Sequence, residues 1–405
     1  MTPSDIYLKH LSLTNFRKYF RLDIELPRRL VLFVGDNAQG KTSVLESIYY
    51  LATFTSLHSQ TDRQLMNYTL NKDSLNVTRM VADYSKNDEL KKIEVRLIDD
   101  LVNNGSHRFR KEILLDGVKK SAQDSIGNFN AVLYIPQMTR IIEGGPDERR
   151  RYLNLALSQA IQGYAKSLTK YSKILTQRNA LLKQIAENRA DLNQLSYWNA
   201  LFIETAAEIV SARYKATSQL NKISKSIHHS LSHGSEEFDI KYKPALHPKN
   251  YSDNQNNVIN NIDIIEQITH EELFKIFERN IDLIQREEII RGVSIIGPHR
   301  DEVRFFSNNI DLGVYGSRGQ IRTALLTLKL SEKQWLSEAT NCAPILLLDE
   351  VLAELDTQRR IDLFNYLKEN GQVLMTTADR SLFSEEFLEN CTIYQVNEGL
   401  INQLQ

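Results

Sequence analysis

The spacing of apolar positions divides the chain into an N-terminal part with strand-like alternation and a middle with helical periodicity. Apolar and polar residues alternate over residues 92–98 and 106–115, and Asp116-Gly117 follows as a hairpin turn signal. From residue 147 to about 232 the helical spacing has few breakers, which predicts a helix hairpin that bends near residues 188–193. Further strands are expected at residues 5–13, 22–26, 75–84 and 131–135, and a further helix at residues 269–283.

Three short runs, at residues 30–34, 344–348 and 372–375, are almost entirely apolar. Continuous apolar runs of this length are typical of parallel strands buried on both faces. Because these runs lie at the two ends of the chain, we expect an α/β fold whose mixed sheet is assembled from both ends. We expect residues 1–145 and 292–405 to form the domain that contains this sheet. Residues 146–291 are expected to form an inserted, mainly helical lobe or short arm.

Composition narrows the class of protein. With 405 residues, of which 41% are apolar, the chain is long enough for two or three domains with a substantial core. It has no run of eighteen apolar residues and no charged-then-apolar N-terminal pattern, so neither a membrane span nor a signal peptide is expected. Only Cys342 and Cys391 occur, which fits a reducing compartment. We therefore expect a cytoplasmic protein.

A phosphate-binding motif of the form GxxxxGK[ST] follows the first buried run and opens a helix-like stretch at residues 42–52. In such a loop, backbone N–H groups and the helix N-terminus surround phosphate oxygens. Lys41 would reach the β- and γ-phosphates of ATP, and Thr42 would ligate Mg²⁺. The alternative is a chance glycine-rich turn. The expected ATP-binding residues are Gly35, Asp36, Asn37, Ala38, Gln39, Gly40, Lys41, Thr42 and Ser43.

Two carboxylates, Asp349 and Glu350, end the second buried run. Ligands bind at the carboxyl ends of the strands in open α/β sheets. Asp349 is therefore placed to hold the Mg²⁺ shell, and Glu350 to orient or deprotonate an attacking water. The alternative is a buried strand that ends at two solvated acids.

A second anion site is expected shortly before the acidic run. Residues 321–335 have helical spacing, which places Ser317, Arg318, Gly319 and Gln320 at a helix N-terminus. These four residues alone are weak evidence for an anion site. Their position just before the acidic strand makes the evidence specific.

A phosphate loop, a signature loop and an acidic strand recur in this order in ABC-type ATPase heads, which this chain resembles. The resemblance implies that two heads sandwich two ATP molecules, with Ser317 of one copy at the γ-phosphate held by Lys41 of the other. One chain has one loop and one signature, so the composite site requires a homodimer. Gln137 would sense Mg²⁺ and water, unless it is an ordinary loop glutamine. Asp379 stands where many such heads have a switch histidine, which argues against rapid hydrolysis.

The chain also resembles the RecF family over nearly its whole length. Residues 11–19 (LSLTNFRKY), 144–153 (GGPDERRRYL) and 297–302 (GPHRDE), with the arginine form of the signature, carry the resemblance. It implies weak, DNA-stimulated ATP hydrolysis by an ATP-dependent dimer that clamps double-stranded DNA near single-strand junctions in gap repair and replication. It also implies RecR, and more loosely RecO, as partners. Gln137 and Glu302 depart from the family pattern, which has an acidic residue and an aspartate there.

Charge is unevenly distributed, although the formal net charge is only −1. Residues 149–225 carry thirteen Lys or Arg against four Asp or Glu, so this segment could neutralise DNA phosphates. Two alternatives remain open: a solvated helix face, and pairing of the arginines with Asp147, Glu148 or acids elsewhere. The candidate DNA contacts are Arg149, Arg150, Arg151, Lys166, Lys170 and Lys173.

Two other functions also fit an ABC-type head. One is a scaffold that binds ATP and barely hydrolyses it, which the missing switch histidine favours. The other is an ATPase subunit of a nuclease-coupled system, which the lack of an acidic cluster after Leu400 disfavours. Residues 299–301 (His-Arg-Asp) are expected to follow a Gly-Pro turn between two strands. We expect them to have a structural or head-coupling role, because Glu350 already fills the role of general base.

Overall fold

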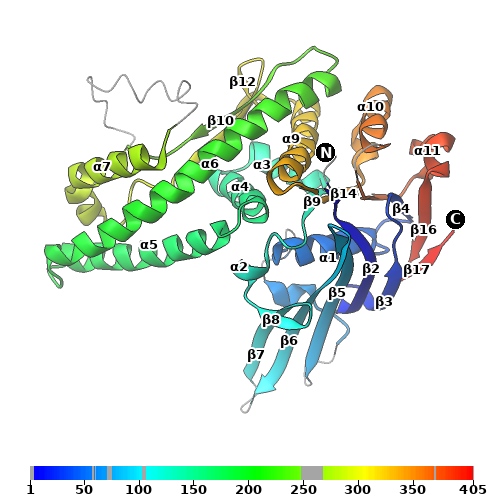
Figure 1. The fold of residues 1–405 in the computed structure, drawn as a ribbon, viewed down its shortest axis with the longest axis horizontal. Coiled ribbons are helices and arrows are strands. Elements are labelled where there is room, and N and C mark those ends of the chain that lie inside the picture. Colours follow the sequence, from blue (N-terminus) through cyan, green and yellow to red (C-terminus); the bar gives the residue numbers. More distant parts are fainter. Residues whose placement is uncertain are drawn as a thin grey trace.

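The computed structural model describes residues 4–56, 59, 61–70, 75–102, 106–247, 268–368 and 371–404. Two six-stranded sheets and an elongated set of helices make up most of this part of the chain (Figure 1). The long green and yellow-green helices extend away from the sheets, and the N- and C-terminal parts of the chain both lie at the sheets (Figure 1).

The first sheet joins the two ends of the chain. β4 (Leu30–Val34) pairs in parallel with β15 (Val373–Thr377) and with β16 (Cys391–Asn397). β15 in turn pairs in parallel with β14 (Ile345–Asp349), which is buried along its whole length. This arrangement confirms the three predicted buried strands. The sheet has the order β17–β16–β4–β15–β14–β9 and is completed by β9 (Ala131–Tyr134) and by β17 (Leu400–Gln403), which is antiparallel to β16.

The second sheet is antiparallel, with the order β3–β2–β5–β6–β7–β8. Two of its turns need left-handed backbone: Arg17 between β2 and β3 (φ 51°) and Asp116-Gly117 between β7 and β8 (φ 49° and 80°). The second of these turns lies at the Asp116-Gly117 signal in the sequence. The strands are β2 (Tyr7–Phe16), β3 (Tyr19–Glu25), β5 (Asn76–Lys86), β6 (Glu89–Val102), β7 (Ser106–Leu115) and β8 (Val118–Lys120).

α1 (Lys41–Thr53) lies between the two sheets. It contacts β9, β14 and β15 of the parallel sheet and β5 and β6 of the antiparallel sheet. Eleven of its thirteen residues are buried, so it is covered on nearly every side rather than along one stripe. The phosphate loop that precedes α1 is therefore attached to a helix fixed from both sides.

The middle of the chain forms the elongated lobe. α5 and α6 form the predicted helix hairpin, which turns at Asn188 (φ 55°), and α7 packs against both helices. A three-stranded sheet of order β10–β11–β12 lies beside α6. The elements are α4 (Pro146–Ala160), α5 (Tyr164–Ala186), α6 (Leu195–Leu231), α7 (His270–Arg291), β10 (Phe238–Lys243), β11 (Glu302–Ser307) and β12 (Ile310–Asp311).

α9 (Arg318–Thr340) connects the lobe to the parallel sheet, because it contacts α4 and α6 as well as β9. α8 (Leu312–Tyr315) is a single turn just before it. The remaining short elements are β1 (Ser4–Asp5), paired with β13 (Cys342–Ala343), α2 (Ala122–Ser125), α3 (Arg140–Glu143), α10 (Thr357–Lys368), α11 (Glu385–Glu389), and the 3-10 turns η1 (Asp62–Leu65), η2 (Pro136–Thr139), η3 (Leu192–Gln194), η5 (Val351–Glu354) and η6 (Arg380–Leu382).

Two predictions for the middle need correction. The helix predicted at residues 269–283 continues to Arg291 and ends at Gly292, whose φ of 63° gives a left-handed C-cap. Residues 299–301 do not lie between two strands, since they follow α7 and lead into β11. Residues 244–261 are rich in Asn, Asp, Ser and Pro, which predicts a loop, and most of them lie outside the described residues.

A fully buried ion pair holds the lobe together. Arg178 of α5 and Glu288 of α7 are both 0% exposed, with an N–O distance of 2.6 Å. The guanidinium also donates to Asn199 Oδ1 of α6 (2.9 Å) and to Ser294 Oγ (2.6 Å). One side chain therefore joins all three long helices, and the carboxylate of Glu288 compensates its positive charge.

We predict that Glu288→Gln lowers the free energy of unfolding by about 3–5 kcal/mol, because it leaves the buried Arg178 without a counter-charge. Replacing both residues by Met and Leu should recover much of this loss, since apolar side chains need no counter-charge. Chemical denaturation measures both effects. Glu271→Gln, which removes a carboxylate from an exposed pair with Lys275, is the control and should unfold like the wild type. Equal stability of Glu288→Gln and this control would contradict the account.

Candidate nucleotide-binding site

The phosphate loop is shaped by contacts with distant strands. Gly40 has φ 118°, and the hydroxyl of Tyr19 in β3 donates to its carbonyl oxygen (3.1 Å). A Cβ at Gly35 would lie 2.2 Å from the carbonyl oxygen of Val396 in β16. Glycine is therefore required at position 35 because the backbone of β16 approaches so closely.

Lys41 is turned into the loop that precedes it. Its side chain is 5% exposed, and Nζ donates to the carbonyl oxygens of Gly35 (2.6 Å) and Asp36 (3.1 Å). Nζ also lies 3.1 Å from Glu350 Oε1. An ammonium group surrounded by the loop backbone is the arrangement that binds nucleotide phosphates.

Asp349 joins the ends of three segments. Thr42 Oγ1 lies 3.0 Å from each carboxylate oxygen, and Thr376 Oγ1 of β15 donates to Oδ1 at 2.6 Å. Burial raises the pKa of Asp349, although the two hydroxyl groups act in the opposite direction. Hydroxyl and carboxylate oxygens are the ligands that Mg²⁺ prefers. Thr42 and Asp349 therefore fit the metal role that the sequence suggests.

Glu350 is held in a left-handed backbone conformation, with φ 49°. This costs a non-glycine residue on the order of 1–3 kcal/mol, and such strain clusters at functional sites. Its N–H donates to Thr376 Oγ1 (3.1 Å), and its Oε2 accepts from the N–H of Ala378 (3.1 Å). The carboxylate is thereby fixed beside Lys41.

These groups line an open cavity of about 660 Å³, and Gln137 of η2 lines it as well. Sequence reasoning missed a further part of the lining, which comes from the β2–β3 turn, α1 and the segment around η1. There Arg17 donates through Nε and NH2 to the two carboxylate oxygens of Glu46 (3.0 and 2.8 Å). The pair Arg17-Lys18 in a hairpin turn was the available signal. The additional lining residues are Arg17, Lys18, Glu46, Gln64, Met66, Tyr68 and Pro136.

The signature segment stands apart from this cavity. Ser317 caps α9 through a reciprocal capping box, in which its Oγ accepts from the N–H of Gln320 (3.2 Å) and its N–H donates to Gln320 Oε1 (3.1 Å). Ser317, Arg318 and Gly319 are exposed. In the described part of the chain, none of these four residues lines the cavity. Within one copy, the serine and the phosphate loop are therefore separate.

The carboxylate of Asp379 is hydrogen-bonded within its own turn. Its Oδ1 accepts from the N–H (2.9 Å) and the hydroxyl (2.6 Å) of Ser381, and these hydrogen bonds lower the pKa of the carboxyl. The group nearest to Glu350 from this segment is the N–H of Ala378. The carboxylate of Asp379 thus caps η6.

The three arginines at the start of α4 are engaged within the fold. Arg149 is 6% exposed and donates to both carboxylate oxygens of Glu302 (2.7 and 3.0 Å). Arg150 and Arg151 each donate to a backbone carbonyl oxygen (2.6 and 2.7 Å). Arg149 is therefore withdrawn as a candidate DNA contact, because its guanidinium is buried against an acid 153 residues away.

Three candidate lysines remain on the surface of α5. Lys166 lies 2.5 Å from Asp124 and Lys170 lies 3.6 Å from Glu204, in pairs that are exposed on both sides. Lys173 is exposed as well. Exposed ion pairs of this kind contribute little to stability. These ammonium groups can therefore leave their carboxylate partners and bind DNA phosphates instead.

His299 has a structural environment. Its Nδ1 lies 2.7 Å from the hydroxyl of Tyr171, and its Nε2 lies 3.1 Å from the carbonyl oxygen of Ser294. Burial lowers the pKa of His299 to about 4, so the ring is neutral at physiological pH. This agrees with the structural role expected for residues 299–301.

A family model described as the RecF/RecN/SMC N terminal domain matches residues 7–402. Proteins named DNA replication and repair protein RecF are similar along nearly the whole chain. The one from an Exiguobacterium species is 32% identical, with 97% of this chain and 98% of the relative covered. The one from Chloroflexus aggregans is 33% identical, with 97% and 99% covered. This chain belongs to the RecF family.

Solved structures agree with this assignment. A structure described as the recombination mediator protein RecF-ATPrS in the RecFOR pathway has a TM-score of 0.81 at 27% identity, with both chains fully covered. An Smc head domain from Pyrococcus furiosus has a TM-score of 0.52 at 14% identity, which is a likeness of fold alone. The RecF family member described here thus has the fold of an ABC-type ATPase head.

The described residues also limit the chemistry outside this site. None of the helices in the described ranges is long and apolar enough to span a bilayer. The same residues contain no group of three or more His, Cys, Asp or Glu side chains placed to hold a metal ion.

The raised pKa of Asp349 predicts a pH-dependent penalty on folding. Below the ordinary pKa of 3.8 the carboxyl is protonated in both the folded and the unfolded protein, so it does not affect stability. Above the raised pKa it is ionised in both states, and the folded protein bears the full cost of the buried charge. Stability without nucleotide should therefore fall as pH rises through this window, and Asp349→Asn should abolish that fall. At about pH 7 the variant should melt no lower than the wild type.

The same variant should lose the rise in melting temperature that ATP and Mg²⁺ give the wild type, because a metal ligand is gone. Thermal unfolding with and without these ligands measures both effects. Asp282→Asn, at an exposed position on α7, controls for the loss of one charge. A variant that is destabilised without nucleotide, or that is still stabilised by ATP and Mg²⁺, would contradict this assignment of Asp349.

Proposed function

We propose that this protein is an ATP-dependent, DNA-binding recombination mediator of the RecF type, in which ATP joins two copies into a clamp on duplex DNA. One observation carries the proposal. Lys41, Thr42 and Asp349 converge on one cavity, whereas Ser317 is exposed at a capped helix start and does not line that cavity. A second copy can supply the missing serine, and a symmetric dimer would then contain two composite sites.

Each group has a defined task in this scheme. Lys41 and the loop N–H groups bind the phosphates, and Ser317 brings the N-terminus of α9 to the γ-phosphate from the second copy. Thr42 and Asp349 would hold Mg²⁺, which when bound neutralises charge on the β- and γ-phosphates. Glu350 orients the attacking water and accepts its proton. Gln137, which lines the same cavity, would contact the attacking water and Mg²⁺.

ATP shifts the monomer–dimer equilibrium because each γ-phosphate contacts both copies, and hydrolysis removes those contacts. The capped carboxylate of Asp379 supports slow turnover, since it is already bound to Ser381. We therefore propose a weak ATPase that DNA stimulates. The same observation keeps a second candidate open, a scaffold that binds ATP and barely hydrolyses it.

DNA is the proposed ligand, because the relatives are named for DNA replication and repair. The preference for duplex near single-strand junctions is proposed from the resemblance to the RecF family. RecR and RecO are the proposed partners, since the structural relatives are described within the RecFOR pathway. The proposed place of action is the cytoplasm. Lys166, Lys170 and Lys173 stay candidate phosphate contacts. Arg150 and Arg151 stay candidates as well, and each already donates to a backbone carbonyl oxygen.

We predict that Glu350→Gln forms a persistent dimer in ATP. The amide keeps the shape of the carboxylate but cannot accept a proton, so hydrolysis should slow by about 10²–10⁴-fold. Light scattering at micromolar protein would measure the dimer, and phosphate release would measure turnover. Glu389→Gln, an exposed position on α11, should behave like the wild type. A Glu350→Gln protein that stays monomeric in saturating ATP would refute the clamp.

We also predict that Lys170→Gln and Lys173→Gln together weaken duplex binding. The slope of the logarithm of the binding constant against the logarithm of salt should become shallower by roughly one for each phosphate that the variant no longer neutralises. Titrations at roughly 50 and 200 mM salt would measure this. Lys275→Gln, whose side chain is 69% exposed on α7, is the matched control. An unchanged slope for the double variant would remove this face of α5 from the DNA-binding surface.

A further inference from the structure

One short segment lies between the nucleotide cavity and the signature helix. It consists of η2 and α3, residues 136–143. Pro136 and Gln137 line the nucleotide cavity. Pro136 also lines a smaller hollow of about 220 Å³ with Arg318 and other residues of the first turn of α9. The segment that senses the nucleotide thus touches the segment that carries the signature.

The end of α3 is bound by Arg149. Its NH1 donates to the carbonyl oxygens of Ile142 (3.3 Å) and Gly144 (2.5 Å). Its Nε and NH2 donate to the two oxygens of Glu302 at the start of β11 (2.7 and 3.0 Å). All three nitrogens of the guanidinium are used, in the bidentate geometry that gives such contacts their directional specificity.

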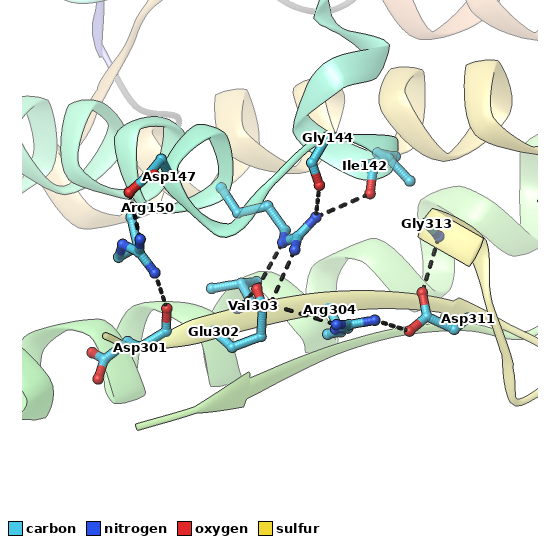
Figure 2. Close-up of polar contacts among 11 residues, drawn as sticks. Ile142, Gly144, Asp147, Arg150, Asp301, Glu302, Val303, Arg304, Asp311 and Gly313 are labelled. Atoms are coloured by element: carbon cyan, nitrogen blue, oxygen red, sulfur yellow. Dashed lines mark hydrogen bonds and ion pairs between the residues drawn. The ribbon is translucent and has the colours of Figure 1, made fainter. Parts of the chain in front are cut away.

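The contacts continue from Glu302 to the start of α8 (Figure 2). Glu302 Oε2 lies 3.6 Å from Arg304 NH2, and Arg304 NH1 donates to Asp311 Oδ2 (2.7 Å). Asp311 Oδ1 accepts from the N–H of Gly313 (3.0 Å) and so caps α8. α8 ends at Tyr315, two residues before Ser317.

α8 also rests directly on α3. A Cβ at Gly313 would lie 2.7 Å from the carbonyl oxygen of Ile142, so glycine is needed for this close approach. Ile142 is therefore in contact with α8 and is also bound by Arg149. The two routes from α3 to the signature, one steric and one ionic, end on the same turn.

We propose that the chain Arg149–Glu302–Arg304–Asp311 is a positioning relay, which sets where Ser317 stands according to the state of the copy's own nucleotide cavity. The inference rests on the proposed function, in which Ser317 completes the site of a second copy. A nucleotide that draws Gln137 toward it moves α3, and the ionic contacts move α8 with it. ATP in one copy thereby prepares that copy's signature for its partner.

A substitution at the exposed end of the relay can disturb the position of α8 without a large loss of stability. The Arg304 side chain is 38% exposed and that of Asp311 is 17% exposed, so the pair contributes little to folding. Arg150 and Arg213 also bind the segment before β11, through Asp301, and these contacts do not continue to α8. Loss of Arg304 should therefore leave the fold intact and remove only the ionic route to α8, while the close contact of Gly313 with Ile142 remains.

The test is Arg304→Gln, with Arg291→Gln as matched control because Arg291 forms an exposed pair with Glu287 on α7. ATP affinity is measured with a fluorescent ATP analogue at protein concentrations where the wild type is monomeric. Dimerisation in ATP is measured by sedimentation, and folding by thermal melting. We expect unchanged melting, unchanged ATP affinity of the monomer and about tenfold weaker dimerisation, which corresponds to the loss of one charge-assisted contact.

A double-mutant cycle gives the second readout. Because the relay acts through Ser317, Arg304→Gln should have little further effect on dimerisation in a Ser317→Ala background. Dimerisation of Arg304→Gln equal to that of the control, an equal loss of monomer ATP affinity, or full additivity with Ser317→Ala would each overturn the relay. Failure of the wild type and of Glu350→Gln to dimerise in ATP would instead reject the proposed function, and the relay with it.

Discussion

The parallel pairing of β4, β15 and β14 is the constraint on which the site depends. It brings Thr42 and Asp349, which are 307 residues apart in sequence, within hydrogen-bonding distance. The pairing is stable because these strands are mostly apolar and almost entirely buried, and their polar residues stand at the carboxyl ends where the site lies. The length of the chain between them can then vary without disturbing the site, which explains how a long helical lobe is accommodated.

The two halves of the proposed catalytic machinery are built differently. The phosphate-binding half is enclosed, with Lys41 buried and Glu350 held in a strained conformation. The signature half is an exposed helix start that is already satisfied by its own capping box. This helix start requires no further contacts within its own chain. It is therefore accessible to a nucleotide bound by a second copy. This asymmetry is the physical reason for proposing that the chain acts as a dimer.

Sequence patterns predicted what depends on local chemistry. The phosphate loop, the acidic strand, the capped start of α9 and the turn at Asn188 all lie where expected, because each follows from nearby residue types. Asp147 was named as an alternative partner of the arginines, and it pairs with Arg150. More distant partners were not predicted, since Arg149 finds Glu302 only after the chain has folded. For the same reason Arg17 was missed, because its partner Glu46 lies on a neighbouring element. Glycine at position 313 gives no sign of its contact with α3 in the sequence alone.

Mixing two inactive variants tests the composite site most directly. Lys41→Ala lacks a working phosphate loop and keeps its signature, whereas Ser317→Arg has the opposite defect. Each variant alone should show no turnover, and their mixture should regain ATP hydrolysis because a mixed dimer contains one intact site. A mixture that stays inactive, although both variants are folded and the mixed dimer forms in ATP, would contradict the account. So would a Ser317→Arg protein that hydrolyses ATP as fast as the wild type.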